Sequence, residues 1–198
     1  MTWNRGLLAA AVALAIGGSA RANYDYSVSA TPASTTFGGT TVALAGRADT
    51  NLSGNNTVNF ADLMVTSTTV APATDTVNDA YTLRITITNP TGGATTGVFT
   101  VTGTLTGTAN STSSVIDNTY FTNTPATQTI GGTGFSINVG PMGLTNVFYQ
   151  PATVNGAAGG LGGQILAGVP EPASVALLGL GGLGLLAVAR ARRRGDTA

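Results

Sequence analysis

The chain contains no cysteine, no histidine and no lysine, and Glu171 is the one glutamate among its 198 residues. Nucleophile–base pairs of the serine–histidine or cysteine–histidine kind are therefore impossible, and metal sites built on nitrogen or sulfur ligands are excluded as well. Without cysteine there is no disulfide from which a redox compartment could be inferred. We accordingly expect a protein that is not an enzyme, with no cofactor and no metal site.

Charged side chains make up only 8% of the chain. Residues 23–168 contain two arginines and six aspartates, which gives this segment a net charge of −4. Nucleic-acid binding depends on clustered cations that meet phosphates, so the composition predicts no nucleic-acid partner. A surface hydrated by threonine, serine and asparagine is expected instead.

Aspartates are the remaining acid–base candidates. Asp75 and Asp79 could form the carboxylate pair of a glycosidase, but they precede a strong strand, where solvated loop aspartates are common. Residues 49–55 place oxygen ligands at alternate positions with glycine at the sixth, as in the first half of a calcium loop. The twelfth position is Phe60 instead of a carboxylate. We interpret both segments as structural.

The N-terminal residues have the three parts of a secretory signal peptide. Arg5 gives a positive start, residues 7–16 form a short apolar run, and Ala20 and Ala22 form a small-x-small cleavage site. We predict a signal peptide over residues 1–22, passed through the secretion translocon and cut by signal peptidase after Ala22. The alternative is a retained N-terminal anchor.

The segment that follows has the period of β-strands. From Ala80 to Thr88 apolar and polar residues alternate, residues 89–93 form a proline- and glycine-containing turn, and Gly97–Thr106 alternate again. The two strands are expected to be antiparallel neighbours. Six to nine short strands predict a fold that is all-β, a single antiparallel β-sandwich over residues 23–154. Weaker strand candidates lie at Tyr24–Ala30, Thr41–Ala45, Val58–Val70, Val115–Thr122, Gly134–Val139 and Val147–Tyr149.

Glycine and threonine are concentrated in particular parts of the chain. Residues 155–168 are rich in glycine, which costs backbone entropy to order, so they predict a flexible linker. Threonines occupy alternate positions from Thr100 to Thr106, in one row with Thr86 and Thr88 nearby. Such ladders resemble the ice-facing arrays of some antifreeze proteins, and they are also typical of the solvent face of a sheet. A hydroxyl-rich face could equally contact polysaccharide.

The C-terminal residues combine a short motif, an apolar run and a basic stop. Pro170 and Pro172 flank Glu171 and hold it in extended backbone. Residues 173–189 would span ~26 Å as a helix, near the lower limit for crossing a bilayer. The arginines behind them are expected to stay in the cytoplasm, with the motif on the outer face. The motif is Val169, Pro170, Glu171 and Pro172, and the stop is the basic tail 190–194 with Arg190, Arg192, Arg193 and Arg194.

Residues 169–194 resemble the sorting signal of PEP-CTERM proteins in the order and the spacing of all these parts. The resemblance implies that an exosortase, a membrane-embedded processing enzyme, recognises the motif. It also implies an exported protein, held briefly in the inner membrane and then delivered to the cell envelope, the surface or the extracellular matrix, with exopolysaccharide as a further candidate partner. An ordinary single-span anchor is the alternative.

Three classes of function follow. The first is a non-catalytic envelope or matrix protein sorted by an exosortase. The second is a secreted carbohydrate- or ice-binding β module on the same tail. The third, an enzyme, would require a close pair of carboxylates.

Overall fold

The computed structural model describes residues 22–89, 95–139 and 148–168, and residues 22–168 form one compact unit. Every regular element within the described ranges is a β-strand, which confirms the all-β prediction. No helix in these ranges is long and apolar enough to span a membrane. The predicted signal peptide up to Arg21, the sorting motif, the membrane helix and the arginine cluster lie outside the described residues.

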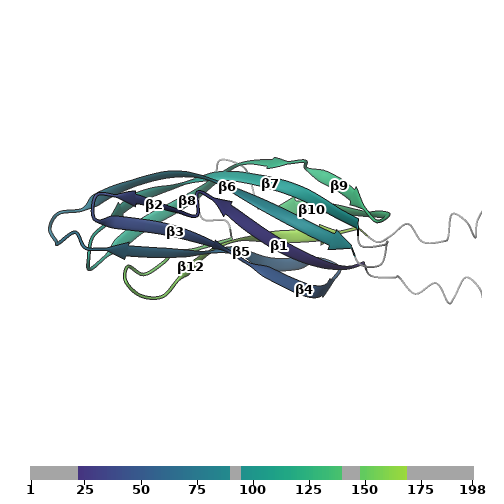
Figure 1. Ribbon diagram of the computed structural model, residues 1–198, viewed down its shortest axis with the longest axis horizontal. Coiled ribbons are helices and arrows are strands. Elements are labelled where there is room, and N and C mark those ends of the chain that lie inside the picture. The colour runs from purple at the N-terminus through teal and green to yellow at the C-terminus, as the bar shows by residue number, and fades with distance from the viewer. Residues whose placement is uncertain (1–21, 90–94, 140–147, 169–198) are drawn as a thin grey trace, which may run out of the picture. The chain divides into compact units, whose positions relative to one another are not determined.

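Five strands form the first sheet, in the order β4-β1-β6-β7-β8, and all neighbours are antiparallel (Figure 1). Its centre is the β6–β7 hairpin, in which the alternating segments Ala80–Thr88 and Gly97–Thr106 pair as predicted. Both strands extend beyond the predicted segments. The bounds are β1 Asn23–Thr31, β4 Ala48–Ser53, β6 Asp75–Asn89, β7 Thr95–Ala109 and β8 Ser114–Thr124.

The second sheet has seven strands, in the order β2-β3-β5-β12-β10-β9, with β11 paired to β12 beside β10. Its neighbours are antiparallel as well. The bounds are β2 Ser34–Phe37, β3 Thr40–Gly46, β5 Asn56–Ser67, β9 Thr127–Ile130, β10 Thr133–Asn138, β11 Tyr149–Gln150 and β12 Gly159–Ala167.

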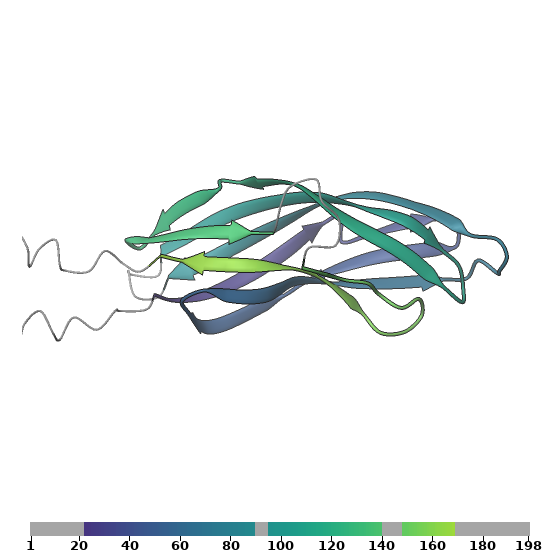
Figure 2. The ribbon, with the colours of Figure 1, turned by 180° about the vertical axis from the view of Figure 1, so that it is seen from behind.

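Strand β12 overturns the predicted linker. Residues 155–168 are not a flexible tether, because Gly159–Ala167 lie between β5 and β10 in the second sheet (Figure 2). The glycines are required by close packing. A Cβ on Gly163 would stand 2.4 Å from Cε2 of Phe60, and a Cβ on Gly159 would stand 2.2 Å from the carbonyl oxygen of Gln150. The domain therefore extends to Gly168, beyond the predicted boundary at residue 154.

Four short segments of chain pass from one sheet to the other. β1 continues into β2, β3 into β4, β4 into β5, and β8 into β9, each after one to two intervening residues. Pro32 and Pro125 stand at two of these passages, where a residue without an N–H interrupts no ladder. Because each passage joins an edge or near-edge strand of one sheet to the other sheet, the two sheets are tied together along their sides.

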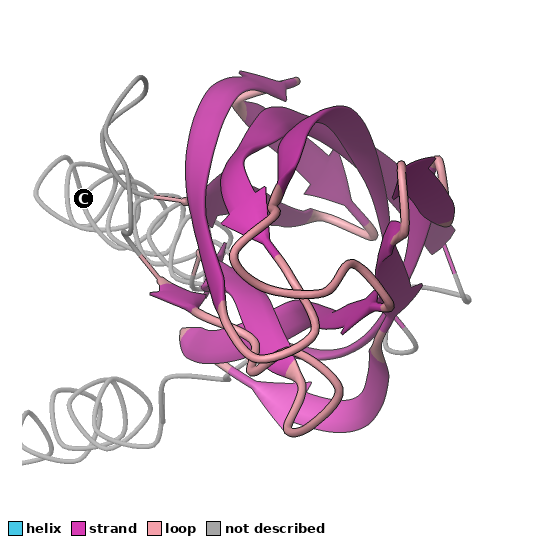
Figure 3. Ribbon diagram, turned by 90° about the vertical axis from the view of Figure 1, so that its left-hand side faces the viewer, coloured by secondary structure: helices cyan, strands magenta, loops and turns pink. Residues whose placement is uncertain are grey.

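The two sheets face each other (Figure 3), and their buried apolar side chains form one core. Tyr24 of β1 meets Phe135 of β10 edge-on, with ring centroids 5.4 Å apart, and Tyr26 meets Phe60 of β5 at 6.4 Å. The buried Tyr120 hydroxyl of β8 donates a hydrogen bond to the Gly162 carbonyl at 2.9 Å. Buried tyrosines thus give the core polar links from sheet to sheet as well as apolar area.

Candidate functional site

The chain enters and leaves the folded domain at one place. The Ala22 carbonyl accepts a hydrogen bond from the Gly54 N–H at 3.2 Å, and the Ala167 N–H donates to Oδ1 of Asn55 at 3.0 Å. Gly54 and Asn55 are consecutive residues in the turn between β4 and β5. The segment before Ala22 and the segment after Ala167 therefore connect to the same end of the domain.

Ala22 is the predicted site residue that falls within the described part of the chain. Its side chain is 4% exposed and belongs to the core. Cleavage after Ala22 would remove the carbonyl that binds Gly54. The other cleavage residue, Ala20, lies outside the described residues, as do the motif Val169 to Pro172 and the arginines of the tail.

The outer face of the first sheet collects hydroxyl side chains from four strands. Thr82 of β6 lies between Thr31 of β1 and Thr102 of β7. Neighbouring strands lie about 4.8 Å apart, and residues on one face of a strand about 6.7 Å, so the hydroxyls form a two-dimensional array. We call this array the hydroxyl face. It consists of Ser27, Ser29, Thr31, Thr82, Thr86, Thr88, Thr96, Thr100, Thr102, Thr104, Thr106, Thr119 and Thr124.

The hydroxyl face is broader than the single threonine row seen in the sequence, and it is not uniform. Arg84 stands exposed between Ser29 and Thr100. On β8 the register shifts opposite Thr102, and Phe121 beside this shift is 49% exposed. The strands also twist, as neighbouring strands in sheets do (Figure 1). The face thus combines hydroxyls with the Arg84 cation, the Phe121 ring and the carboxylates of Asp25 and Asp117, which pair with Thr88 and Thr106.

The two candidate catalytic aspartates are not loop residues. Asp75 begins β6, and its Oδ2 accepts hydrogen bonds from the Thr40 hydroxyl at 2.7 Å, the Thr69 hydroxyl at 2.5 Å and the Gly39 N–H at 3.1 Å. These bonds to the threonine hydroxyls, followed by those of the backbone, hold the pKa of the Asp75 carboxyl below its ordinary value. Through these hydrogen bonds Asp75 links the β2–β3 turn to the start of β6.

Asp79 lies within β6 and is 6% exposed. Burial raises the pKa of its carboxyl, and the hydrogen bond from the Thr35 hydroxyl at 3.0 Å partly offsets this effect. Each aspartate is therefore engaged by threonines of the β2–β3 region. The prediction that they are structural fits these contacts, although their expected place in a solvated loop is wrong.

The calcium-like segment 49–55 is mostly an edge strand. Residues Ala48–Ser53 form β4, and Oδ1 of Asp49 accepts the N–H of Thr50 at 2.8 Å. Asp25 accepts the N–H of Asn51, also at 2.8 Å. Among the described residues, no group of three acidic side chains is placed to hold a metal ion.

In the comparison with protein families, residues 168–194 match the model of the PEP-CTERM protein-sorting motif. No curated protein and no solved structure matches the chain. The matched range begins at Gly168, whose N–H still donates to the Gly134 carbonyl at 2.7 Å, so the motif starts where the folded domain ends. The chain therefore carries a PEP-CTERM protein-sorting motif, as the order and spacing of residues 169–194 predicted.

Proposed function

We propose that the chain is a non-catalytic protein of the cell envelope or extracellular matrix, exported by a signal peptide and sorted by an exosortase. The observation that carries the proposal is the match of residues 168–194 to the PEP-CTERM sorting motif. In this scheme Pro170, Glu171 and Pro172 are recognised as substrate by the exosortase. Residues 173–189 span the inner membrane, and the arginines of the tail keep the C-terminal residues in the cytoplasm until processing.

The folded domain suits this role as a stable cargo. In our proposal it is a β-sandwich whose polar outer faces carry few charges, with threonines and serines over most of one face. Its entry and exit points meet at Gly54 and Asn55, so processing near Glu171 would leave every strand of the domain intact.

The Glu171→Ala variant tests the sorting proposal in the native host. The glutamate is the one charged residue of the motif, so its loss is expected to leave the protein in the inner membrane, with a several-fold drop at the cell surface. Asp196→Ala is the matched control, because it removes a carboxylate from the same tail outside the motif. Surface delivery of Glu171→Ala at the level of the control would overturn the proposal.

The second candidate is a carbohydrate- or ice-binding module that uses the hydroxyl face. It is favoured by the alignment of hydroxyls over four strands, and the exposed ring of Phe121 favours the carbohydrate arm, because sugars stack on aromatic rings. Thr104→Lys should lower co-sedimentation with the host's polysaccharide or weaken inhibition of ice recrystallisation. Thr129→Lys, an exposed change on β9, serves as the control. Equal behaviour of the two variants in both assays would remove this candidate.

A further inference from the structure

The strands β4 and β5 are consecutive, yet they do not pair with each other. β4 pairs with β1 in the first sheet, and β5 pairs with β3 and β12 in the second sheet. The two strands are tied only at their ends. The Arg47 N–H donates to the Phe60 carbonyl at 2.8 Å, and at the turn Asn56 Nδ2 donates to the Ser53 and Gly54 carbonyls, both at 3.2 Å.

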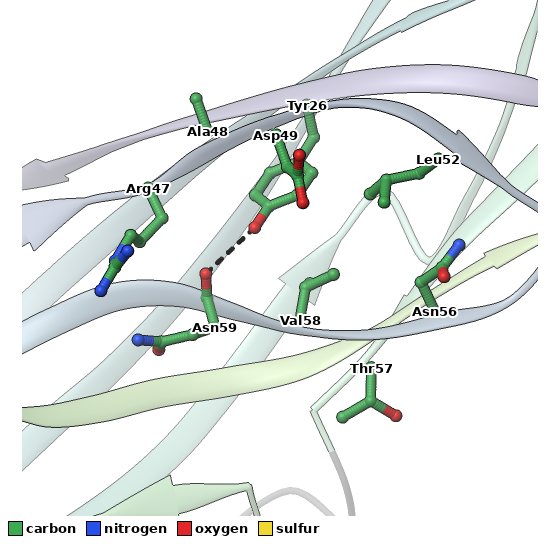
Figure 4. Close-up of a pocket in the computed structure, with 9 residues that line it drawn as sticks. All are labelled: Tyr26, Arg47, Ala48, Asp49, Leu52, Asn56, Thr57, Val58 and Asn59. Atoms are coloured by element: carbon green, nitrogen blue, oxygen red, sulfur yellow. Dashed lines mark hydrogen bonds between the residues drawn. The ribbon is translucent and has the colours of Figure 1, made fainter.

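Between these ties the strands separate around a cavity of about 350 Å³ (Figure 4). We call it the β4–β5 slot. The Tyr26 ring from β1 stands at its back, and the Tyr26 hydroxyl donates to the Asn59 carbonyl at 3.2 Å. Ala48 and Thr57 point away from it. The side chains that matter for binding are Tyr26, Arg47, Asp49, Leu52, Asn56 and Val58.

The charges of the slot disfavour an anionic ligand. The Arg47 guanidinium already binds a carboxylate, because its Nε lies 2.8 Å from Oδ2 of Asp62. Asp49 then adds a second carboxylate to the same region. The pKa of the Tyr26 hydroxyl is raised by burial and by the Asp49 charge and lowered by the Arg47 charge, in agreement with both charged groups lying near this hydroxyl.

The slot contains both hydrogen-bond donors and hydrogen-bond acceptors. Nδ2 of Asn56 is engaged by the Tyr24 hydroxyl at 2.9 Å and by the turn carbonyls, which holds the amide in place and leaves its Oδ1 as an acceptor. Asp49 offers Oδ2 as another acceptor, since its Oδ1 binds the Thr50 N–H. The terminal nitrogens of Arg47 are donors. Leu52 and Val58 add an apolar wall.

A fitting ligand is neutral, carries several hydroxyls that donate and accept, and has an apolar side. We propose that the β4–β5 slot binds one sugar unit of a neutral polysaccharide. Its volume lies at the lower end of the range of small-molecule sites, roughly 300–1,000 Å³. Polar side chains outnumber apolar ones in its lining, which suits a ligand rich in hydroxyls. The inference concerns the folded domain alone. It gives the carbohydrate-binding candidate a concave subsite apart from the hydroxyl face, and it holds whether or not an exosortase processes the tail.

The test is an NMR titration of the full chain in detergent micelles with cellotetraose, maltotetraose and tetragalacturonate. At least one neutral tetrasaccharide should give saturable shifts at residues 47–49 and 56–59, and tetragalacturonate should bind at least ~10-fold more weakly. Asp49→Ala should weaken the binding of the neutral probe ~10-fold, because a hydrogen bond to a charged group is lost. Asp117→Ala, on β8 at the other edge of the first sheet, should leave the affinity unchanged.

Three results would overturn the inference. They are the absence of saturable shifts at the slot with both neutral probes, shifts confined to the hydroxyl face, and tighter binding of tetragalacturonate. Asp49 is exposed on an edge strand, so we expect the Asp49→Ala variant to fold. Unchanged NMR signals from residues outside the slot would verify this. None of these results depends on Glu171, so this inference and the sorting proposal can fail separately.

Discussion

At the scale of single residues, Asp75 and Asp79 show how one strand gives two carboxyls opposite properties. Asp75 accepts three hydrogen bonds, which lower its pKa in the folded state. Its contribution to stability is therefore present above the unfolded pKa and lost as the pH falls through the folded pKa. Burial raises the pKa of Asp79 instead. The folded state then favours the protonated carboxyl, and stability is lost as the pH rises through the unfolded and then the folded pKa.

Substitution by asparagine should therefore act in opposite directions at the two positions. Asp75→Asn should lower the melting temperature at neutral pH and flatten its fall between about pH 5 and pH 2. Asp79→Asn should raise the melting temperature at neutral pH, because it removes a buried charge while the amide Oδ1 can still accept the hydrogen bond from Thr35. Near pH 3 this gain should disappear, because the Asp79 carboxyl is then protonated in the original protein as well. Thermal unfolding across this pH range is the measurement. Parallel pH profiles of the two variants would contradict the assignment of hydrogen bonding to Asp75 and burial to Asp79.

At the scale of elements, alternation in the sequence predicted β6 and β7 because most of their inward residues, such as Leu83, Ile85 and Phe99, are large and apolar. In β12 the inward positions Leu161, Gly163 and Ile165 alternate too, but glycine at the middle position hides the period. The glycine is needed because Phe60 fills the space over it, and no local pattern reveals a ring that belongs to β5. The short polar strands β2, β4 and β9 were missed because they bury little apolar surface.

A glycine pair tests the position of β12. Gly163→Ala should destabilise the domain by about 1–3 kcal/mol, since the new Cβ meets the Phe60 ring. Gly134→Ala on β10 is the control, because a Cβ there has no neighbour within 4 Å, and it should change stability by less than about 1 kcal/mol. Chemical denaturation of both variants is the measurement. Equal stabilities would restore the flexible linker that the glycine content suggests.

At the scale of the whole molecule, the sorting motif was predictable because its evidence is local, in residues 169–194, and the family match agrees with it. The hydroxyl face could not be predicted from the sequence, because it depends on the register of strands that are distant in sequence. Thr31, Thr82 and Thr102 become neighbours only through the pairing of β1, β6 and β7. The β4–β5 slot was hidden for a similar reason, since a sequence with a turn at Gly54 and Asn55 predicts a paired hairpin and gives no sign that its strands part.

The intact mass of the protein recovered from the surface of its native host tests the central claim most directly. Sorting by an exosortase predicts a chain that begins after the signal peptide and ends near Glu171, without the apolar segment 173–189, with or without an added group. Every strand of the folded domain would then be present, because β1 begins at Asn23 and β12 ends at Ala167. A surface protein whose mass includes every residue to Ala198 would contradict the claim and indicate a plain membrane anchor.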